Sequence, residues 1–219
     1  MQKKFEGTFF ISKKNCNFAA PKRGEGAVIP PSCSVNEVNM VEKQIKLYDK
    51  TFALYILERE IVGAISKMAD VMRRDLDGKN PLYVGILSGA YMFSAELTSR
   101  LSPTCELTFA AFSSYHGTKS AGIVQELLPI PKKNKDRPYV LLEDIVDSGL
   151  TMQYVTNRLR EDGVKDVRVA TMLLKPKALQ CDLKLDYVGM EIENDFIVGF
   201  GLDYEGLGRT SRNIYKIVE

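Results

Sequence analysis

The stretch YVLLEDIVDSGLT, residues 139–151, decides the fold of this chain. Its first four residues are apolar and follow Arg137-Pro138, so they predict a buried central strand that ends before Glu143. A Ser/Gly turn comes next, and a helical pattern then runs from about Thr151 to Glu161. A buried strand, a tight loop and a helix in this order are typical of an α/β protein with a mostly parallel sheet.

The loop of this stretch suits a phosphorylated sugar. Backbone N–H groups at the start of a helix lack partners, and the helix dipole adds positive potential, so a phosphate can bind there. Ser148 and Thr151 add hydroxyl donors. Glu143 and Asp144 can accept from a ribose diol and hold Mg²⁺, and Asp147, between diol and phosphate, is a candidate base. From these residues alone, a solvated acidic turn with Thr151 as the helix N-cap is the alternative.

Composition limits the class of protein. The chain has 219 residues, which predicts one domain with a sizeable core. With 45% hydrophobic and 26% charged residues, the composition is typical of a soluble protein. The net charge of +2 predicts that it binds no nucleic acid. The four cysteines lie far apart and His116 is the only histidine, so the sequence indicates neither a zinc site nor a Ser-His-Asp triad. It contains neither an apolar run of about 18 residues nor a signal peptide, so we expect a cytoplasmic protein without membrane contact.

The first 39 residues mix Lys, Gly, Pro, Ser and Asn without a period. We expect residues 1–39 to be a poorly ordered extension and residues 40–219 to form the domain. Met40 stands where the regular pattern begins, so it is a possible native start.

A second strand-loop-helix unit precedes the central one. The run LYVGIL, residues 82–87, predicts a buried strand, Ser88-Gly89 a short loop, and residues 91–101 a helix. Glycine lets a backbone approach an anion closely, so this loop is a second candidate phosphate site, although such turns also connect strands and helices without a ligand. Residues 57–76 carry apolar side chains at helical spacing, which predicts a helix packed on the core.

Further elements follow along the chain. Strands are predicted at 105–112 and 166–175, and Lys175 ends the later one. The long polar connection 113–136, which begins near Ser114-Tyr115, is either a lid or a plain solvent loop. The runs 186–192 and 196–204 flank a Glu-Asn-Asp turn, which predicts a hairpin.

The string EDIVDSGLT, residues 143–151, resembles the phosphoribosyl-pyrophosphate signature of type I phosphoribosyltransferases, two acids followed by D-[ST]-G-x-T. From about Ile45 onward, the order of the motifs resembles the hypoxanthine (hypoxanthine-guanine) members of that family. The resemblance implies a central, mostly parallel sheet flanked by helices, with a small β hood from about residue 183 to 219. Ser88 and Leu150 depart from the pattern, because many members have lysine at these positions.

The resemblance also implies a role for each candidate residue. The catalytic base is Asp147, and the phosphoribosyl group is bound by Glu143, Asp144, Asp147, Ser148, Gly149, Leu150 and Thr151. Pyrophosphate is bound by Ser88, Gly89 and Arg209, and the lid begins with Ser114 and Tyr115. The purine is bound by Lys175, which donates to its 6-oxo group, and by the hood residues Asp186, Tyr187 and Val188, with Tyr187 stacked on the ring. The metal ligands are Glu143 and Asp144, with Asn194 or Asp195 for a second ion.

The implied activity is purine salvage, in which a 5-phosphoribosyl group passes from phosphoribosyl pyrophosphate to hypoxanthine or guanine, giving IMP or GMP and pyrophosphate. Mg²⁺ is the implied cofactor, and a homodimer or homotetramer is the implied assembly. The alternative is a transcriptional regulator of the same fold that senses phosphoribosyl pyrophosphate. Lys175, Tyr187 and the long loop favour catalysis, because a sensor needs no base pocket, and the near-neutral charge gives no nucleic-acid footprint.

Overall fold

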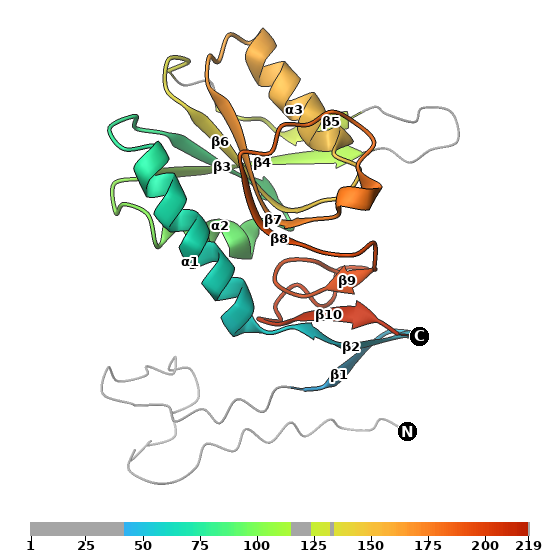
Figure 1. The fold of residues 1–219 in the computed structure, drawn as a ribbon. Coiled ribbons are helices and arrows are strands. Elements are labelled where there is room, and N and C mark those ends of the chain that lie inside the picture. The colour runs from blue at the N-terminus through green and yellow to red at the C-terminus, as the bar shows by residue number, and fades with distance from the viewer. Residues whose placement is uncertain (1–41, 115–123, 132–133, 219) are drawn as a thin grey trace, which may run out of the picture. The chain divides into compact units, whose positions relative to one another are not determined.

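The computed structural model describes residues 42–114, 124–131 and 134–218 (Figure 1). These residues belong to one compact unit, Glu42–Glu219. The predicted extension 1–39, Met40 and Tyr115 of the predicted lid lie outside the described residues. No helix in the described ranges is long and apolar enough to cross a bilayer.

Fourteen elements are described in this unit, most of them arranged as alternating strands and helices. In chain order they are β1 (Gln44–Leu47), β2 (Lys50–Ile56), α1 (Glu58–Asp75), β3 (Leu82–Leu87), α2 (Tyr91–Thr98), β4 (Glu106–Ser114), β5 (Val124–Leu128), β6 (Tyr139–Val146), α3 (Leu150–Glu161), β7 (Val167–Leu174), the 3₁₀ turn η1 (Pro176–Ala178), β8 (Tyr187–Glu191), β9 (Ile197–Val198) and β10 (Ile214–Ile217).

The main sheet has six strands in the order β5-β4-β3-β6-β7-β8. All neighbouring pairs are parallel except β4 and β5. The apolar runs LYVGIL and YVLL become the adjacent central strands β3 and β6, because a parallel sheet covered on both faces needs continuous apolar strands. The predicted α/β fold with a mostly parallel sheet is confirmed.

Alternation along β6 divides the core between the two faces of the sheet. Val140 and Leu142 pack in one cluster with the buried residues of α1 and α2, whereas Tyr139 and Leu141 pack in another with those of α3. Figure 1 shows α1 and α2 on one side of the sheet and α3 on the other. The predicted core helix is confirmed, because Ile61, Ile65, Met68 and Met72 of α1 are all buried.

The hood differs from the prediction. The expected hairpin of residues 186–192 and 196–204 does not form, since β8 joins the main sheet parallel to β7 and the two-residue β9 pairs with β10. The hood sheet has the order β1-β2-β10-β9, so residues 44–56 contribute half of its strands. Its small core contains Phe52, Val198 and Tyr215. Apolar runs identify strands, but they do not say which strand is the partner.

Two further boundaries differ. Strand β6 continues through the acids to Val146, because it pairs with β7 as far as Val146 opposite Leu174. Glu143 and Asp144 therefore lie within the strand, where their side chains point to fixed faces, and not in the turn after it. The connection predicted at 113–136 contains the short strand β5, which pairs with the end of β4.

Candidate active site

The loop between β6 and α3 has a fixed backbone. Gly149 has a positive φ of 79°, and an added Cβ there would lie 2.9 Å from Sγ of Cys181, so only glycine fits. The carbonyl of Ser148 accepts a hydrogen bond from the N–H of Gln180 at 3.0 Å. The segment after β7, which contains Gln180 and Cys181, therefore packs against the phosphate loop and fixes its backbone.

The start of α3 is open to an anion. Leu150 N–H lies 3.5 Å from Oγ of Ser148, a weak contact, and no side chain of the described residues caps the helix at Gly149. A cavity of about 110 Å³ lies beside this loop. The residues that line it include predicted phosphoribosyl-binding residues: Glu143, Asp147, Ser148, Gly149 and Thr151. The structure brings these side chains together around the N–H groups of the first helical turn.

Lys175 and Asp147 form an ion pair. Nζ of Lys175 donates to Oδ2 of Asp147 at 2.9 Å. The lysine side chain is 10% exposed and the carboxylate 53% exposed, so the charge at the end of β7 is buried while its partner faces solvent. Lys175 N–H also donates to the carbonyl of Val146, which joins the ends of the two strands. The lysine predicted to bind the purine and the acid predicted to act as the base thus meet directly.

Glu143 and Asp144 are neighbouring acids with little solvent. Burial raises the pKa of Glu143 well above its usual value, and the nearby Asp144 raises it further. Burial also raises the pKa of Asp144, to about 6, although backbone N–H groups and Arg209 act in the opposite direction. Perturbed carboxyl groups of this kind are typical of functional sites.

The second predicted phosphate loop, at Ser88-Gly89, lies against Asp144 of the acid pair. An added Cβ on Gly89 would lie 1.8 Å from Oδ2 of Asp144, and one on Gly201 would lie 1.9 Å from the Gly89 carbonyl oxygen. Gly89 is therefore held between a carboxylate of β6 and the hood, at a distance that any side chain would prevent. Ser88, the preceding residue, is exposed, and the peptide bond between Leu87 and Ser88 is cis.

Arg209 joins this group from the hood. Its guanidinium forms an ion pair with Asp203 at 2.6 Å and donates to the carbonyl of Gly201 at 2.7 Å. The hydroxyl of Tyr91 in α2 donates to the Arg209 carbonyl at 3.2 Å. Because both Arg209 and Asp203 influence the pKa of Asp144, the three charged groups share one site.

The acids suit a hard cation that is shared with a substrate. Oε2 of Glu143 is buried and has no hydrogen-bond partner among the described residues, so it is an oxygen ligand available to a cation. In the ranges that the structure describes, no three metal-ligating side chains lie close enough to hold an ion alone. Mg²⁺ usually binds through one or two carboxylates together with substrate oxygens, and the site fits that mode.

The predicted base-stacking residue lies elsewhere. Tyr187 is 5% exposed in the core, and its hydroxyl accepts from Arg168 at 2.8 Å. It pairs with Ala170, five residues before Lys175, which is about 16 Å along a strand. Asp186 accepts from Val169 N–H, and Val188 is paired with Thr171, so both also lie far from Lys175. The expected hood position of Asp186, Tyr187 and Val188 was wrong because β8 belongs to the main sheet.

The residues predicted for a second metal ion lie beside the hood sheet. Asp195 forms an ion pair with Lys216 of β10 at 3.1 Å, and Asn194 beside it is exposed. The acid that the hood brings to Asp144 is Asp203, which sequence reasoning missed. A signal was present, because Asp203 stands in LDYEGLGR, the same stretch as Arg209.

The predicted lid is described only at its start. Ser114 is the last residue of β4, so the connection leaves the sheet at the end of a parallel strand. The carboxyl ends of β3, β4, β6 and β7 share one edge, where both phosphate loops and Lys175 also lie.

Comparison with known proteins agrees with this geometry. A family model described as a phosphoribosyl transferase domain matches residues 55–205. Among curated relatives, the hypoxanthine-guanine phosphoribosyltransferase of Lactococcus lactis is 39% identical over 168 residues, covering 76% of this chain and 90% of the relative. The protein of the same name from Streptococcus mutans is 38% identical over 148 residues, covering 67% and 82%.

Solved structures give the same result. A hypoxanthine phosphoribosyltransferase from Staphylococcus aureus superposes with a TM-score of 0.71 at 30% identity, covering 75% of this chain and 90% of that one. A hypoxanthine-guanine phosphoribosyltransferase from Bacillus anthracis superposes with a TM-score of 0.71 at 29% identity, covering 75% and 98%.

Proposed function

The chain belongs to the phosphoribosyltransferase family, and on that premise we propose how its site carries out the reaction. The activity is purine salvage: the 5-phosphoribosyl group of phosphoribosyl pyrophosphate is transferred to hypoxanthine or guanine, giving IMP or GMP and pyrophosphate. The observation that carries the proposal is the meeting of Lys175 and Asp147 beside an uncapped helix start that follows two acids.

The loop 147–151 would hold the 5-phosphate. The N–H groups of the first turn of α3 and the hydroxyls of Ser148 and Thr151 would donate to its oxygens. This grip is remote from the anomeric carbon, so it positions the sugar without taking part in bond breaking.

The leaving pyrophosphate would be received on the other side of the sugar. Bond breaking at the anomeric carbon leaves positive charge on the ribose and negative charge on the leaving oxygen. Arg209 and the backbone of Ser88-Gly89 would stabilise that negative charge, since a guanidinium donates to two phosphate oxygens at once. Support comes from the contact of Gly89 with Asp144 and from the coupling of Arg209 to the same acid.

Asp147 and Lys175 would act on the purine. Lys175 would donate to the 6-oxo group, and Asp147 would accept the proton or hydrogen bond at the imidazole ring. One donor of the Lys175 ammonium is used by Asp147, and the other two would remain for the purine oxygen, so the pair would also hold the carboxylate in place.

We assign base stacking to Phe196 in place of Tyr187. Phe196 is 46% exposed. It lies four residues after Ile192, and the N–H of Ile192 donates to the carbonyl of Leu174, the residue before Lys175. An exposed aromatic ring at this end of β8 is available to a flat ligand.

Family membership implies a divalent cation, and we propose Mg²⁺. Glu143 and Asp144 would hold it together with the ribose diol, and Asp203 would hold a second ion together with pyrophosphate oxygens. When bound, the cation neutralises charge on the leaving group.

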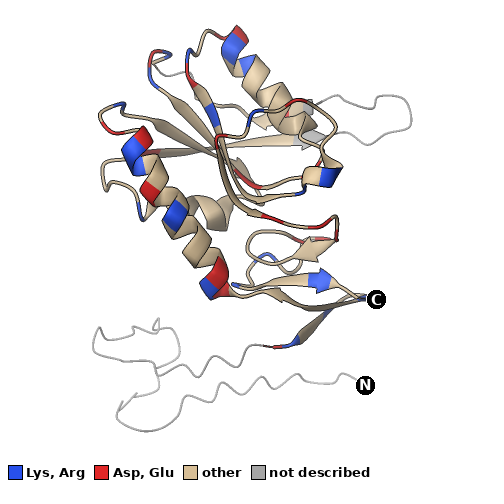
Figure 2. Ribbon diagram, in the orientation of Figure 1, with Lys and Arg blue, Asp and Glu red and all other residues tan. Residues whose placement is uncertain are grey.

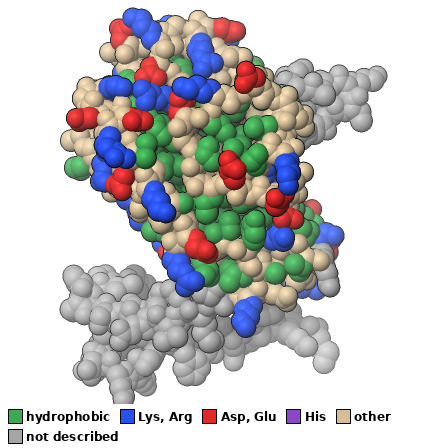
Figure 3. Space-filling model, in the orientation of Figure 1, with side chains coloured by type: hydrophobic (Ala, Val, Ile, Leu, Met, Phe, Trp, Pro, Cys, Tyr) green, Lys and Arg blue, Asp and Glu red, His purple; other side chains and the backbone are tan. Residues whose placement is uncertain are grey.

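We also propose a homodimer or homotetramer in the cytoplasm. A groove of about 670 Å³ runs between α1 and β8, the end strand of the main sheet. Figure 3 shows hydrophobic side chains in the middle of this face with charges around them. The groove is lined by apolar side chains and by charges of both signs, which can pair across a two-fold axis: Arg59, Glu60, Ala64, Lys67, Met68, Val71, Val188 and Met190. Val188→Lys should convert the assembly to monomer in light scattering, and an unchanged mass would contradict this interface.

The regulator alternative gains no support. Figure 2 shows lysine and arginine mixed with aspartate and glutamate along α1 and the hood, whereas a nucleic-acid surface gathers one sign.

The direct test is a spectrophotometric assay of the purified protein with phosphoribosyl pyrophosphate and Mg²⁺, offered hypoxanthine, guanine, xanthine and adenine in parallel. We expect turnover of hypoxanthine and guanine above the other two bases. Absence of turnover with every base, while phosphoribosyl pyrophosphate still binds, would favour the regulator.

A further inference from the structure

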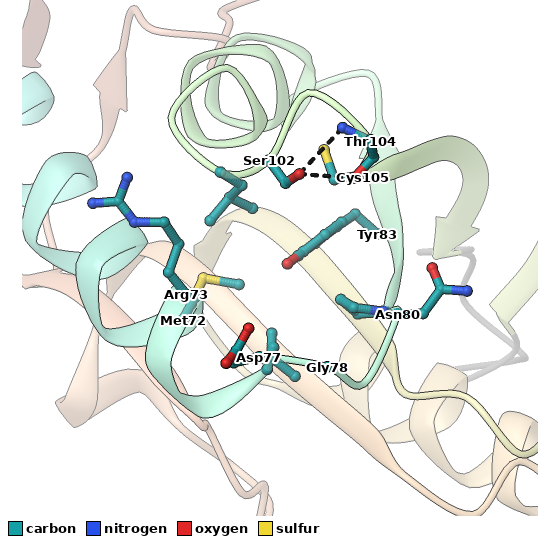
Figure 4. Close-up of a pocket in the computed structure, with 12 residues that line it drawn as sticks. Met72, Arg73, Asp77, Gly78, Asn80, Tyr83, Ser102, Thr104 and Cys105 are labelled. Atoms are coloured by element: carbon teal, nitrogen blue, oxygen red, sulfur yellow. Dashed lines mark hydrogen bonds between the residues drawn. The ribbon is translucent and has the colours of Figure 1, made fainter.

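A hollow of about 370 Å³ lies at the amino ends of β3 and β4 (Figure 4). It is bounded by the end of α1, by Asn80-Pro81 before β3 and by the segment between α2 and β4. The candidate active site lies at the carboxyl ends of the same strands. The two sites therefore share β3 but no residue.

The hollow has a mixed lining. Apolar wall comes from Met72, Leu76, Leu101 and the ring of Tyr83, and polar groups come from Arg73, Asp77, Asn80, Ser102 and Thr104. The volume is at the lower end of the range of small-molecule sites, about 300–1,000 Å³, so it suits a compound of one or two rings.

Tyr83 places its hydroxyl in this space. The residue is 3% exposed, and Figure 4 shows its hydroxyl directed into the hollow. No described residue forms a hydrogen bond with that hydroxyl, although buried tyrosines normally have a partner. Burial raises the pKa of Tyr83 to about 12, so the group stays a neutral O–H donor under physiological conditions.

Several other polar groups of the wall are already engaged. Arg73 pairs with Asp70 and donates to the carbonyl of Arg100 at 3.1 Å. The hydroxyls of Ser102 and Thr104 bond to each other at 2.8 Å. Anionic ligands would meet the Asp77 carboxylate on the wall and cationic ligands would meet the Arg73 guanidinium, so the lining favours a neutral ligand.

We propose that this hollow binds a neutral aromatic compound of one or two rings that carries a carbonyl or ring-nitrogen acceptor. The ring lies between Met72, Leu76 and Leu101, and the acceptor takes the hydrogen bond of the Tyr83 hydroxyl. The site is a second small-molecule site, separate from the one that binds phosphoribosyl pyrophosphate and purine.

Benzamide tests the acceptor and toluene serves as its acceptor-free counterpart. Both are titrated into the full chain while backbone amide NMR signals are followed. Benzamide should shift the signals of residues 78–83 and 101–105 with a dissociation constant of about 10 mM or lower, as expected for a fragment with nine heavy atoms. Absence of shifts at that concentration, or shifts confined to residues 147–151 and 175, would overturn the proposal.

Tyr83→Phe removes one oxygen and keeps the ring. It should weaken benzamide binding by about 3- to 10-fold and leave toluene binding unchanged, because only benzamide uses the hydroxyl. Tyr154→Phe, an exposed position on α3, should change neither. Equal benzamide affinity in wild type and Tyr83→Phe would overturn the proposal.

Thermal unfolding gives a readout that needs no probe. Since the Tyr83 hydroxyl forms no hydrogen bond with another described residue, Tyr83→Phe should leave the Tm unchanged or raise it. A lower Tm would show that the hydroxyl already bonds to the protein, which would exclude it as the donor to a ligand.

Discussion

Nζ of Lys175 lies 2.9 Å from Oδ2 of Asp147, although helix α3 separates the two residues in the chain. Parallel pairing of β6 and β7 brings them together, because the carboxyl ends of both strands reach the same edge of the sheet. The buried ammonium and the exposed carboxylate thus share one hydrogen bond. An ammonium has three N–H donors, so Lys175 can hold Asp147 and donate to a purine at the same time.

Asp147→Asn should lower kcat by about 10²- to 10⁴-fold, the usual contribution of a positioned base. The asparagine still accepts a hydrogen bond from Lys175, so IMP affinity should change much less than turnover. Steady-state kinetics and calorimetric titration with IMP measure the two effects separately. An equal loss of turnover and of IMP affinity would contradict the role of base.

Lys175→Met should raise the KM for hypoxanthine by about 10- to 100-fold, because a charged hydrogen bond to the purine is lost while the apolar stem is kept. The matched control is Lys177→Met. Lys177 lies two residues after Lys175, and its exposed ammonium pairs with Glu193. We expect the control to retain the wild-type KM. If both variants behave alike, the effect is general electrostatics and not base recognition.

Gly89→Ala should lower kcat/KM at least about 100-fold, because a Cβ would meet the Asp144 carboxylate at 1.8 Å and displace it from the site. Gly63→Ala is the control: an added Cβ there meets nothing within 4 Å in the middle of α1. That variant should keep full activity and gain up to about 1 kcal/mol of stability from helix propensity. Full activity in Gly89→Ala would show that the loop can move away from Asp144 without consequence.

Asp144→Asn should stabilise the protein in a pH-dependent way. The folded pKa of Asp144, about 6, lies above its ordinary value of 3.8, so the folded state binds the proton more tightly than the unfolded state. Wild type therefore loses stability as pH rises from about 4 through 6, by about 1–3 kcal/mol in all. The asparagine variant lacks this loss.

Chemical unfolding at several pH values without divalent cations measures this difference. The variant should match the wild type near pH 4 and exceed it above pH 6. A stability difference that is the same at every pH would show that the charge of Asp144 is not the cause.

Much of this site could be predicted because its signals are local. The stretch 139–151 encodes a buried strand, a glycine that tolerates a positive φ and an open helix start, each decided within a few residues. The position of Lys175 could be predicted in the same way, because this residue directly follows the next parallel strand.

The hood could not be predicted, because its order depends on pairing between distant segments. Residues 50–56 and 214–217 form adjacent strands, although residues 57–213 lie between them in the chain. The run 187–191 looks like a hood strand in sequence, yet β7 and α1 bury Tyr187 in the main sheet. Which aromatic ring is exposed, Tyr187 or Phe196, is decided by that packing and leaves no local signal.

The position of the second acid gives the sharpest test of the corrected hood. Asp203 pairs with Arg209 at 2.6 Å and influences Asp144, whereas Asp195 pairs with Lys216 at 3.1 Å in the hood sheet. Asp203→Asn should raise the KM for phosphoribosyl pyrophosphate about 10-fold or more, because the cation loses a charged ligand and Arg209 loses the partner that orients it.

The Mg²⁺ concentration for half-maximal activity should rise in Asp203→Asn as well. Asp195→Asn removes the same charge from a neighbouring position of the hood and should leave both constants near the wild-type values. The comparison is matched in size, charge and region, so general loss of negative charge affects both variants alike. A larger effect in Asp195→Asn than in Asp203→Asn would restore the metal position expected from sequence and reject the one built on Arg209.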